Sequence, residues 1–282
     1  MKEEKQLNNN IVVLGCGESI LALTEEEIRF INKSKIVIAI NKFAAFYDIV
    51  GIIPNYIYFH DELDNAFLIY KYILEKCYSN NLTNLTIFTN KRFKHISSRY
   101  FSYIYIPYLK IRSYLKWNIL KKRTWNADQV YKSQSIKISH KPLNSKFISV
   151  KLEEYDKGEL WAKNLNEELF NYKGSLSSVL NICSIISPNT PIYLVGNDFN
   201  SSRYFFQDKL EKDFPEWKDY TTNITKQYNK HMSFIPTNGK TFIDAIPTII
   251  KHLNETGNQL YCTNPKSLLC TKANVPFKKL PI

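Results

Sequence analysis

Long apolar runs are missing from this sequence, in which no stretch approaches the roughly 20 apolar residues that a membrane-spanning helix needs. The first ten residues are polar and contain no apolar signal region. We therefore expect a cytoplasmic protein. Because 44% of the 282 residues are hydrophobic, the chain can bury a sizeable core and is expected to be globular.

Cysteine is also scarce. The 5 cysteines form no CxxC pair and show no zinc-like spacing with the 5 histidines, so we expect neither a disulfide framework nor a metal site. Cys77 and Cys183 fall in apolar stretches with helical character. Both are therefore expected to be buried core thiols.

Several catalytic motifs are absent. No Walker sequence occurs, and Gly15-Cys-Gly-Glu-Ser19 is not a GxGxxG fingerprint, because Ile20 stands where the third glycine would fall. ATP hydrolysis and NAD binding are therefore disfavoured, and no cofactor is expected. The chain also lacks the Gly-x-Ser-x-Gly elbow of α/β-hydrolases and the Asp-x-Asp pair that holds a metal in many nucleotide-sugar transferases.

Charge of one sign predominates. The net charge is +12, from 38 Lys+Arg against 26 Asp+Glu, which implies attraction to anions such as nucleic acids, anionic lipids, sugar phosphates or nucleotides. Lysine and tyrosine are common along the whole chain, so their interleaving is weak support for nucleic-acid binding. A nucleic-acid partner is not expected, although a basic nucleic-acid-binding protein stays as the less favoured alternative.

What the sequence does contain is an alternation of short apolar strands with helices. Strands are predicted over residues 11–14, 35–40, 56–59, 85–89, 191–195 and 259–262. Helices are predicted over 65–78, 176–186 and 241–253, with Pro247 as a kink or break, and Thr24 with Glu27 predicts a capping box for another helix. This alternation predicts an α/β fold: a modified Rossmann-like parallel sheet with helices on both faces, which binds ligands at the carboxyl ends of its strands.

The middle of the chain differs in character. We expect residues 1–90 and 172–282 to form the α/β domain, and residues 91–171 to form an inserted lid subdomain on the acceptor side. The basic, tyrosine-rich part of this segment could be an interfacial membrane helix. A helix packed on the domain with a solvated basic face is an equally good interpretation.

Candidate ligand-binding residues follow the predicted strands. The turn Gly15-Cys-Gly-Glu-Ser19 can bring backbone amides against a phosphate, with a tight turn without a ligand as the alternative. Asn41 and His60 each end a strand and would either face the same crevice or cap a turn. Asp198 follows another strand, where it could hold a ribose or orient a loop. His231 could accept a proton from a hydroxyl near neutral pH, and a surface histidine is its alternative.

The order of these motifs resembles the Campylobacter-type sialyltransferases of glycosyltransferase family 42, which transfer sialic acid from CMP-sialic acid onto lipooligosaccharide galactose or another sialic acid. The matching segments are Gly15-x-Gly17-x-Ser19, Asn41, Tyr193-Leu-Val-Gly-Asn-Asp198-Phe, Pro215-Glu-Trp217-Lys and Leu260-Tyr-Cys-Thr-Asn-Pro265-Lys-Ser-Leu-Leu269. The resemblance implies a GT-A-like fold and an inverting, metal-independent transferase. Its CMP-sugar would be a co-substrate.

The resemblance also implies roles for individual residues. The nucleotide-sugar site would contain Gly15, Cys16, Gly17, Ser19, Asn41, Lys42, His60, Gly174, Ser175, Gly196, Asp198 and Asn200. Tyr204 would donate a hydrogen bond to the leaving phosphate, Trp217 would lie on the acceptor side, and His231 would be the general base. The partners implied are a CMP-activated acidic sugar, a glycan or glycolipid acceptor, and an anionic membrane contacted peripherally at the inner face of the cytoplasmic membrane. The oligomeric state is left open, and a homo-oligomer is one of the alternatives.

Three positions depart from the family pattern. Cys16 and His60 replace asparagines, and Asn200 replaces a tyrosine. These departures leave the sugar open, so that a related nonulosonic acid or Kdo would also be compatible. They also motivate an alternative function, a catalytically inactive relative that binds nucleotide or glycan within an assembly complex.

Overall fold

A computed structural model of the chain describes residues 8–60, 66–82, 85–90, 146–152, 160–201, 203–213, 231–236 and 239–282. The chain divides into two compact units, one comprising Met1–Tyr58 and Lys151–Ile282 and the other Phe59–Val150. The segment predicted to form a lid, residues 91–171, lies mostly outside the described residues.

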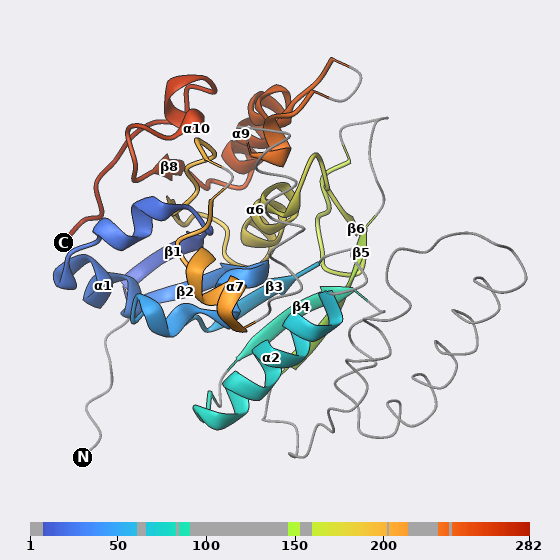
Figure 1. Ribbon diagram of the computed structural model, residues 1–282. Helices are drawn as coiled ribbons and strands as arrows, with labels where there is room; N and C mark the ends of the chain where they lie inside the picture. The colour runs from blue at the N-terminus through green and yellow to red at the C-terminus, as the bar shows by residue number, and fades with distance from the viewer. Residues whose placement is uncertain are drawn as a thin grey trace, which may run out of the picture. The chain divides into compact units, whose positions relative to one another are not determined.

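The first unit is built on a parallel sheet (Figure 1). Its strands are β1 (Asn8–Leu14), β2 (Ser34–Ile40), β3 (Tyr56–Phe59, of which Phe59 belongs to the second unit), β7 (Ile192–Val195) and β8 (Leu260–Cys262). They are arranged in the order β3-β2-β1-β7-β8, and every one of these pairings is parallel. The predicted strands are therefore confirmed. β1 begins earlier than predicted because the polar residues at its start carry no apolar signal.

The second unit contains α2 (Ala66–Ser79) and β4 (Thr86–Asn90), which confirm the predicted helix and fourth strand. β5 (Lys146–Leu152) pairs in parallel with β4. The last two residues of β5, Lys151 and Leu152, belong to the first unit, where they pair in parallel with β6 (Glu168–Leu169). β5 and β6 were not predicted, and both lie inside the segment expected to be a lid.

The described helices of the first unit are α1 (Glu25–Asn32), α6 (Ser175–Ile186), α7 (Gln207–Asp213), α9 (Ile246–Glu255) and α10 (Leu268–Thr271). Short 3-10 helices are η1 (Glu18–Ala22), η2 (Asn41–Ala45), η3 (Tyr47–Ile49), η5 (Met232–Phe234) and η6 (Phe242–Ala245). The predicted capping box is confirmed at α1, where Thr24 accepts from the Glu27 N–H at 3.2 Å and the Thr24 N–H donates to the Glu27 carboxylate at 2.8 Å.

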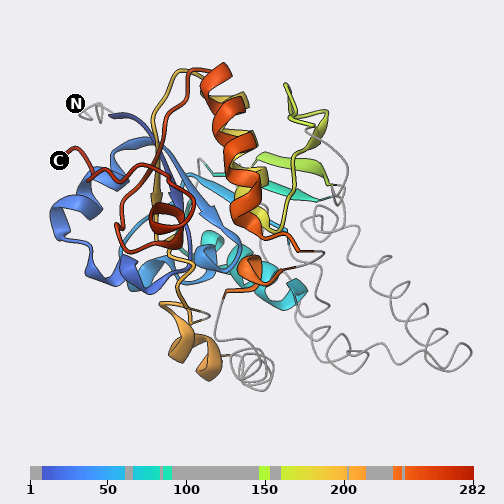
Figure 2. The same ribbon diagram turned by 90° about the horizontal axis from the view of Figure 1, so that it is seen from above.

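The order of the strands determines which face of the sheet each helix covers. The chain moves from β1 to β2 in one direction along the sheet, and from β7 to β8 in the other. Because crossover connections between parallel strands are right-handed, α1 covers one face, while α6 and α9 lie together on the opposite face (Figures 1 and 2). This confirms the α/β, Rossmann-like fold. The direction reverses between β1 and β7, and such a switch point is where open parallel sheets bind ligands.

The predicted helix over 241–253 is divided in two. Its first part is η6, which begins with a capping box between Thr241 and Asp244. Pro247 occupies the first turn of α9, where a missing N–H and a fixed φ are tolerated. The predicted break at Pro247 is therefore confirmed, and it marks the start of the α-helix.

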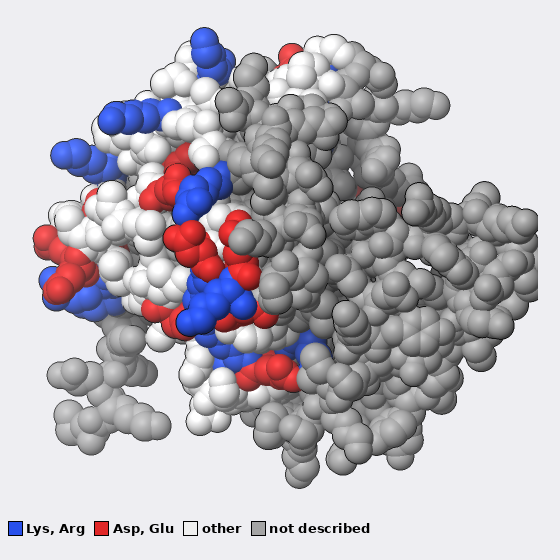
Figure 3. All heavy atoms as spheres, viewed as in Figure 1, with Lys and Arg blue, Asp and Glu red and all other residues white. Residues whose placement is uncertain are grey.

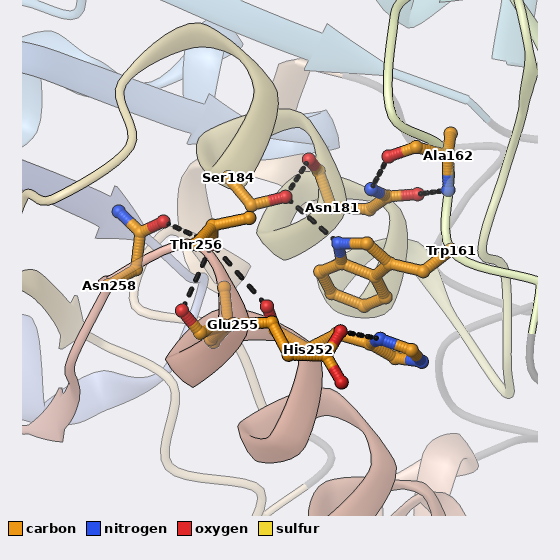
Figure 4. Close-up of polar contacts among 9 residues, drawn as sticks. Trp161, Ala162, Asn181, Ser184, His252, Glu255, Thr256 and Asn258 are labelled. Carbon is orange, nitrogen blue, oxygen red and sulfur yellow. Dashed lines mark hydrogen bonds and ion pairs between the residues drawn. The ribbon is translucent and has the colours of Figure 1, made fainter.

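A buried asparagine fixes α6 to the segment that precedes it (Figure 4). Asn181 is fully buried, and its Oδ1 accepts hydrogen bonds from the backbone N–H groups of Ala162 and Phe170, both at 3.0 Å. Its Nδ2 donates to the Ala162 carbonyl at 2.9 Å. One amide therefore satisfies three backbone groups that would otherwise be buried without partners.

An indole ring extends this contact to α9 (Figure 4). Trp161 Nε1 donates to Ser184 Oγ at 3.0 Å, and its ring stacks on His252 with centroids 5.2 Å apart. His252 Nδ1 in turn lies 2.9 Å from a carboxylate oxygen of Glu255. Contacts of Asn181 and Ser184 thus fix α6 in place. The candidate site lies at the N-terminal end of this helix.

Cys77 and Cys183 are buried, as predicted. On the face shown in Figure 3, the Lys and Arg side chains near the centre of the view lie beside Asp and Glu side chains, whereas those at the upper left stand apart from acidic side chains. In the part of the chain that the structure describes, no helix has both the length and the apolar character needed to cross a bilayer.

Candidate functional site

A cavity of about 260 Å³ lies at the carboxyl ends of β1 and β2, next to the N-terminal end of α6. Eight of the residues predicted for the site line it: Gly15, Cys16, Asn41, Lys42, Gly174, Ser175, Tyr204 and His231. Its other lining residues are Ile40, Leu176, Asn197, Phe199, Ser233 and Phe242. Segments separated by more than 200 residues in the sequence therefore meet at one place, because the parallel sheet brings its strand ends together.

A second cavity, of about 50 Å³, adjoins the first. The two share Cys16, Asn197, Phe199, Tyr204 and His231 in their linings. The smaller cavity is also lined by Gly17, Gly196, Asp198, Ser201 and Arg203. Three further predicted residues, Gly17, Gly196 and Asp198, thus lie beside the larger cavity without lining it.

The glycine turn after β1 packs directly against the loop after β7. The Gly15 N–H donates to the Val195 carbonyl at 2.8 Å, and the Gly17 N–H donates to the Gly196 carbonyl at 2.7 Å. A Cβ atom on Gly15 would lie 2.4 Å from the Gly196 oxygen, and one on Gly17 would lie 2.3 Å from Asp198 Oδ2. Close packing between two loops accounts for both glycines, and their N–H groups are engaged within the protein rather than open to a phosphate.

Asp198 joins three loops. The residue is 8% exposed, and its carboxylate accepts from the Ser19 N–H at 2.9 Å, from Ser19 Oγ at 2.5 Å and from Asn264 Nδ2 at 2.7 Å. These contacts match the alternative in which Asp198 orients a loop. The same loop continues to Asn200, which donates to the Lys266 carbonyl at 2.7 Å and lines neither cavity.

The end of the cavity at α6 is suited to an anion. Gly174 is the N-cap residue and provides no side-chain cap, so Ser175 and Leu176 begin the helix at the cavity wall. Asn41, with φ of 47°, donates through Nδ2 to Ser175 Oγ at 2.9 Å. The positive end of the helix dipole and the Lys42 ammonium lie in the same lining, which contains no Asp or Glu among the described residues.

Tyr204 also belongs to this lining. Its ring stacks on Phe206 with centroids 5.2 Å apart, and Lys42 Nζ lies 5.9 Å from the Tyr204 ring centroid. The neighbouring Arg203 forms ion pairs with Glu18 at 3.2 Å and with Asp208 at 2.8 Å. Because Lys42 lines the larger cavity and Arg203 lines only the smaller one, Lys42 is the better placed of the two cations to attract an anion in the larger cavity.

His231 lies at the junction of the two cavities. Its Nδ1 accepts from the Ser233 N–H at 3.2 Å, and its ring meets the Phe199 ring edge-on, with centroids 4.8 Å apart. Burial lowers the pKa of His231 from 6.5 to about 4, so the imidazole is neutral at pH 7. The side chain is half-buried in a structured site, unlike the free surface histidine considered as its alternative.

Cys16 is also common to both cavities. Burial raises its pKa to about 12, an effect that the charge of Lys42 opposes. Its Sγ lies 3.8 Å from the Ile40 carbonyl, to which the thiol donates. A protonated thiol is a poor nucleophile, so Cys16 shapes the wall of the site and is not suited to covalent chemistry.

The remaining predicted residues lie elsewhere. Ser19 lines neither cavity and acts through Asp198. His60 follows β3 in the second unit and belongs to neither lining. Trp217 lies outside the described residues.

Four polar or aromatic residues that line the larger cavity were not predicted from the sequence: Asn197, Phe199, Ser233 and Phe242. Asn197 and Phe199 flank Asp198 and could have been found from the same motif. Phe199 has φ of 58°, which is uncommon for a residue with a side chain. Ser233 and Phe242 carried no local signal, because only the packing of η5 and η6 brings them to the cavity.

Comparisons with protein-family models, with curated protein sequences and with solved structures gave no match. Within the described ranges, no group of three or more His, Cys, Asp or Glu residues is arranged to hold a metal ion.

Proposed function

We propose that this protein is an inverting glycosyltransferase that takes sialic acid, or a related nonulosonic acid, from a CMP-linked donor without a metal ion. The observation that carries the proposal is the composition of the larger cavity. Its lining includes Lys42, Tyr204 and the N-terminal end of α6, and none of its described lining residues is acidic. Such a lining favours a ligand with negative charge on its phosphate and on its sugar carboxylate.

The reaction fits these groups. When the bond between the anomeric carbon and the phosphate oxygen breaks, negative charge develops on the leaving CMP. A cation such as Lys42 and a hydroxyl donor such as Tyr204 can stabilise this charge. The leaving group therefore needs no divalent metal in this scheme. The acceptor is proposed to be a bacterial surface glycan such as lipooligosaccharide, reached from the cytoplasmic side of the membrane.

The proposal rests on the donor site and not on His231 as a base. A general base works best when its pKa is near the operating pH. The His231 pKa is about 4, and its Nδ1 already accepts a hydrogen bond from Ser233. This ring is therefore a weak base at pH 7.

Donor turnover and binding by the purified chain test the function. CMP release is measured with CMP-sialic acid, related CMP-nonulosonic acids and CMP-Kdo, and thermal stabilisation by CMP is measured in parallel. Tyr204→Phe should lower kcat at least 10-fold, because a hydroxyl donor to developing charge is lost. The matched control is Tyr261→Phe, since the Tyr261 hydroxyl donates to Gln259 at the surface and Tyr261 lines neither cavity. No stabilisation by CMP and no release from any donor would refute the proposal.

A second candidate function is favoured by the weak basicity of His231 and by the internal engagement of Asp198. In this alternative, the chain is a catalytically inactive relative that binds a nucleotide or glycan within an assembly complex. It predicts stabilisation by CMP together with no CMP release from any donor. The same two measurements therefore separate the transferase from the binding protein.

A further inference from the structure

We propose that His231 acts in this site as a hydrogen-bond donor, presenting its Nε2–H to an anionic oxygen of the bound ligand. This inference rests on the proposed function for the identity of the ligand. The protonated nitrogen itself follows from the geometry alone. The role differs from that of a general base, which would require a free lone pair on the ring.

The backbone around His231 determines which nitrogen carries the proton. The Ser233 N–H points at Nδ1 over 3.2 Å, and a backbone N–H can only donate. Nδ1 must therefore be the acceptor. A neutral imidazole has one donor and one acceptor nitrogen, so the proton is on Nε2. The Phe234 N–H donates to the His231 carbonyl at 2.9 Å, which holds the backbone of this turn in place.

Aromatic packing fixes the plane of the ring. The His231 ring lies edge-on to Phe199, and Phe199 is in turn packed against Phe234 and Phe242, with centroids 5.2 and 5.7 Å apart. With Nδ1 facing its own backbone, the side of the ring that remains for the cavities carries Nε2. Nε2 has no hydrogen-bond partner among the described residues, so a ligand can take that place.

The surrounding groups indicate which ligand atom would accept this hydrogen bond. The charged groups in the two linings are Lys42, Arg203 and Asp198, and the titratable neutral ones are Cys16 and Tyr204. Arg203 forms ion pairs with Glu18 and Asp208, and the Asp198 carboxylate accepts from the Ser19 N–H. The positive charge of Lys42 disfavours a second positive charge in the cavity and attracts a negatively charged ligand. The combination of a neutral N–H donor and an ammonium suits an anionic oxygen, which in a CMP-sugar belongs to the phosphate or to the sugar carboxylate.

The tautomer can be measured without any assumption about function. Nitrogen-15 NMR of the histidine-labelled full chain at pH 7 distinguishes the two tautomers, and loss of one signal set in His231→Gln assigns the residue. We expect the Nε2–H form at pH 7 and still at pH 5.5. An Nδ1–H tautomer, or an imidazolium at pH 6.5, would overturn the inference whatever the protein binds.

Substitution then tests the role of the donor. Glutamine can place an N–H close to the position of Nε2, whereas alanine cannot. His231→Ala should weaken ligand binding about 10-fold or more, and His231→Gln should restore most of the loss, because a hydrogen bond to a charged oxygen is involved. A general base predicts the opposite for turnover: kcat would fall equally in both variants, and this result would overturn the donor role.

Three probes identify the oxygen. CMP carries only the phosphate, free sialic acid carries only the carboxylate, and CMP-sialic acid carries both. A loss of affinity in His231→Ala for CMP places the donor at the phosphate, whereas a loss for the acid sugar and for CMP-sialic acid, but not for CMP, places it at the carboxylate. Equal affinities of wild type and His231→Ala for every probe would contradict the inference. If the wild type binds none of them, it is the proposed function that fails, and the NMR result still decides the tautomer.

Discussion

Ser19 donates both its backbone N–H and its hydroxyl to the carboxylate of Asp198, at 2.9 and 2.5 Å, although 179 residues separate them in the sequence. This pair joins the first glycine turn to the loop after β7, at the point where the strand order reverses. The two cavities are lined by the residues on either side of this junction. The shape of the site therefore depends on a contact that does not itself face the larger cavity.

Replacing Asp198 should destabilise the fold. In Asp198→Ala, the Ser19 N–H, the Ser19 hydroxyl and Asn264 Nδ2 lose their acceptor in a buried place, and we expect a loss of about 2 to 3 kcal/mol in the free energy of unfolding. Asp208→Ala is the control, since Asp208 is 89% exposed and pairs only at the surface, which should cost less than about 1 kcal/mol. Urea denaturation measures both, and equal losses would contradict this account.

Adding one methyl group at Gly17 should separate the same loops. Gly17 has φ of −71°, so alanine meets no backbone strain there, but its Cβ would lie 2.3 Å from Asp198 Oδ2. We expect Gly17→Ala to cost more than about 2 kcal/mol. Gly51 provides the opposite case, with φ of 69° and nothing within 4 Å of an added Cβ. Gly51→Ala should cost only about 1 kcal/mol, from the backbone alone. Thermal melting compares them, and a smaller shift for Gly17→Ala would refute the steric argument.

Asn181 and Asn32 offer a comparison of buried and exposed amides that both bond to backbone groups. Asn181→Ala leaves three buried backbone groups without partners, and we expect it to cost about 3 kcal/mol or more. Asn32 makes two such bonds, to Gly51 and Ile53, at the surface. Water replaces them in Asn32→Ala, which should cost about 1 kcal/mol or less. Equilibrium unfolding in urea gives both values, and similar costs would show that burial does not decide the difference.

Stability should depend on pH through His231. Its pKa is about 4 in the folded chain and near 6.5 when unfolded, so between these values the unfolded chain binds the extra proton. Stability is therefore complete above pH 6.5 and falls as the pH decreases toward 4, by at most about 2 kcal/mol from this residue between pH 7 and pH 5. His231→Gln should remove this part of the loss. Parallel pH profiles of unfolding free energy for the two proteins would show that the pKa is not lowered.

Affinity for CMP should depend on Lys42. Removing this ammonium from the cavity in Lys42→Met should weaken CMP binding about 10-fold and reduce the salt dependence of binding, because the phosphate loses a cation. Lys35 lies near the start of the same strand, β2, and is exposed. Lys35→Met removes the same charge far from the strand end and should leave the affinity within about two-fold. Calorimetry in low and high salt measures this, and equal effects would indicate a general charge effect rather than a site.

The sequence by itself determined the local elements. The core strands were predicted because buried parallel strands are continuous apolar runs, as in Ile11–Leu14, and the start of α1 was predicted because Thr24 and Glu27 are close enough in sequence to form a capping box. Because β1 and β2 are adjacent and parallel, the glycine turn after β1 and Asn41 after β2 lie next to each other in one site. β5 was missed because it lies within a segment interpreted as an insertion, although apolar and polar residues alternate over its last five positions, 148–152.

Only the tertiary structure decided how the site residues are used. The partner of Asp198 is Ser19, the space beside Gly17 is filled by a carboxylate, and Nδ1 of His231 faces the Ser233 N–H rather than the cavity. A sequence pattern records which side chains are present and which face of an element they occupy. Whether a polar atom is already satisfied depends on the position of its partner to within a fraction of an ångström, and that is fixed when distant segments pack together.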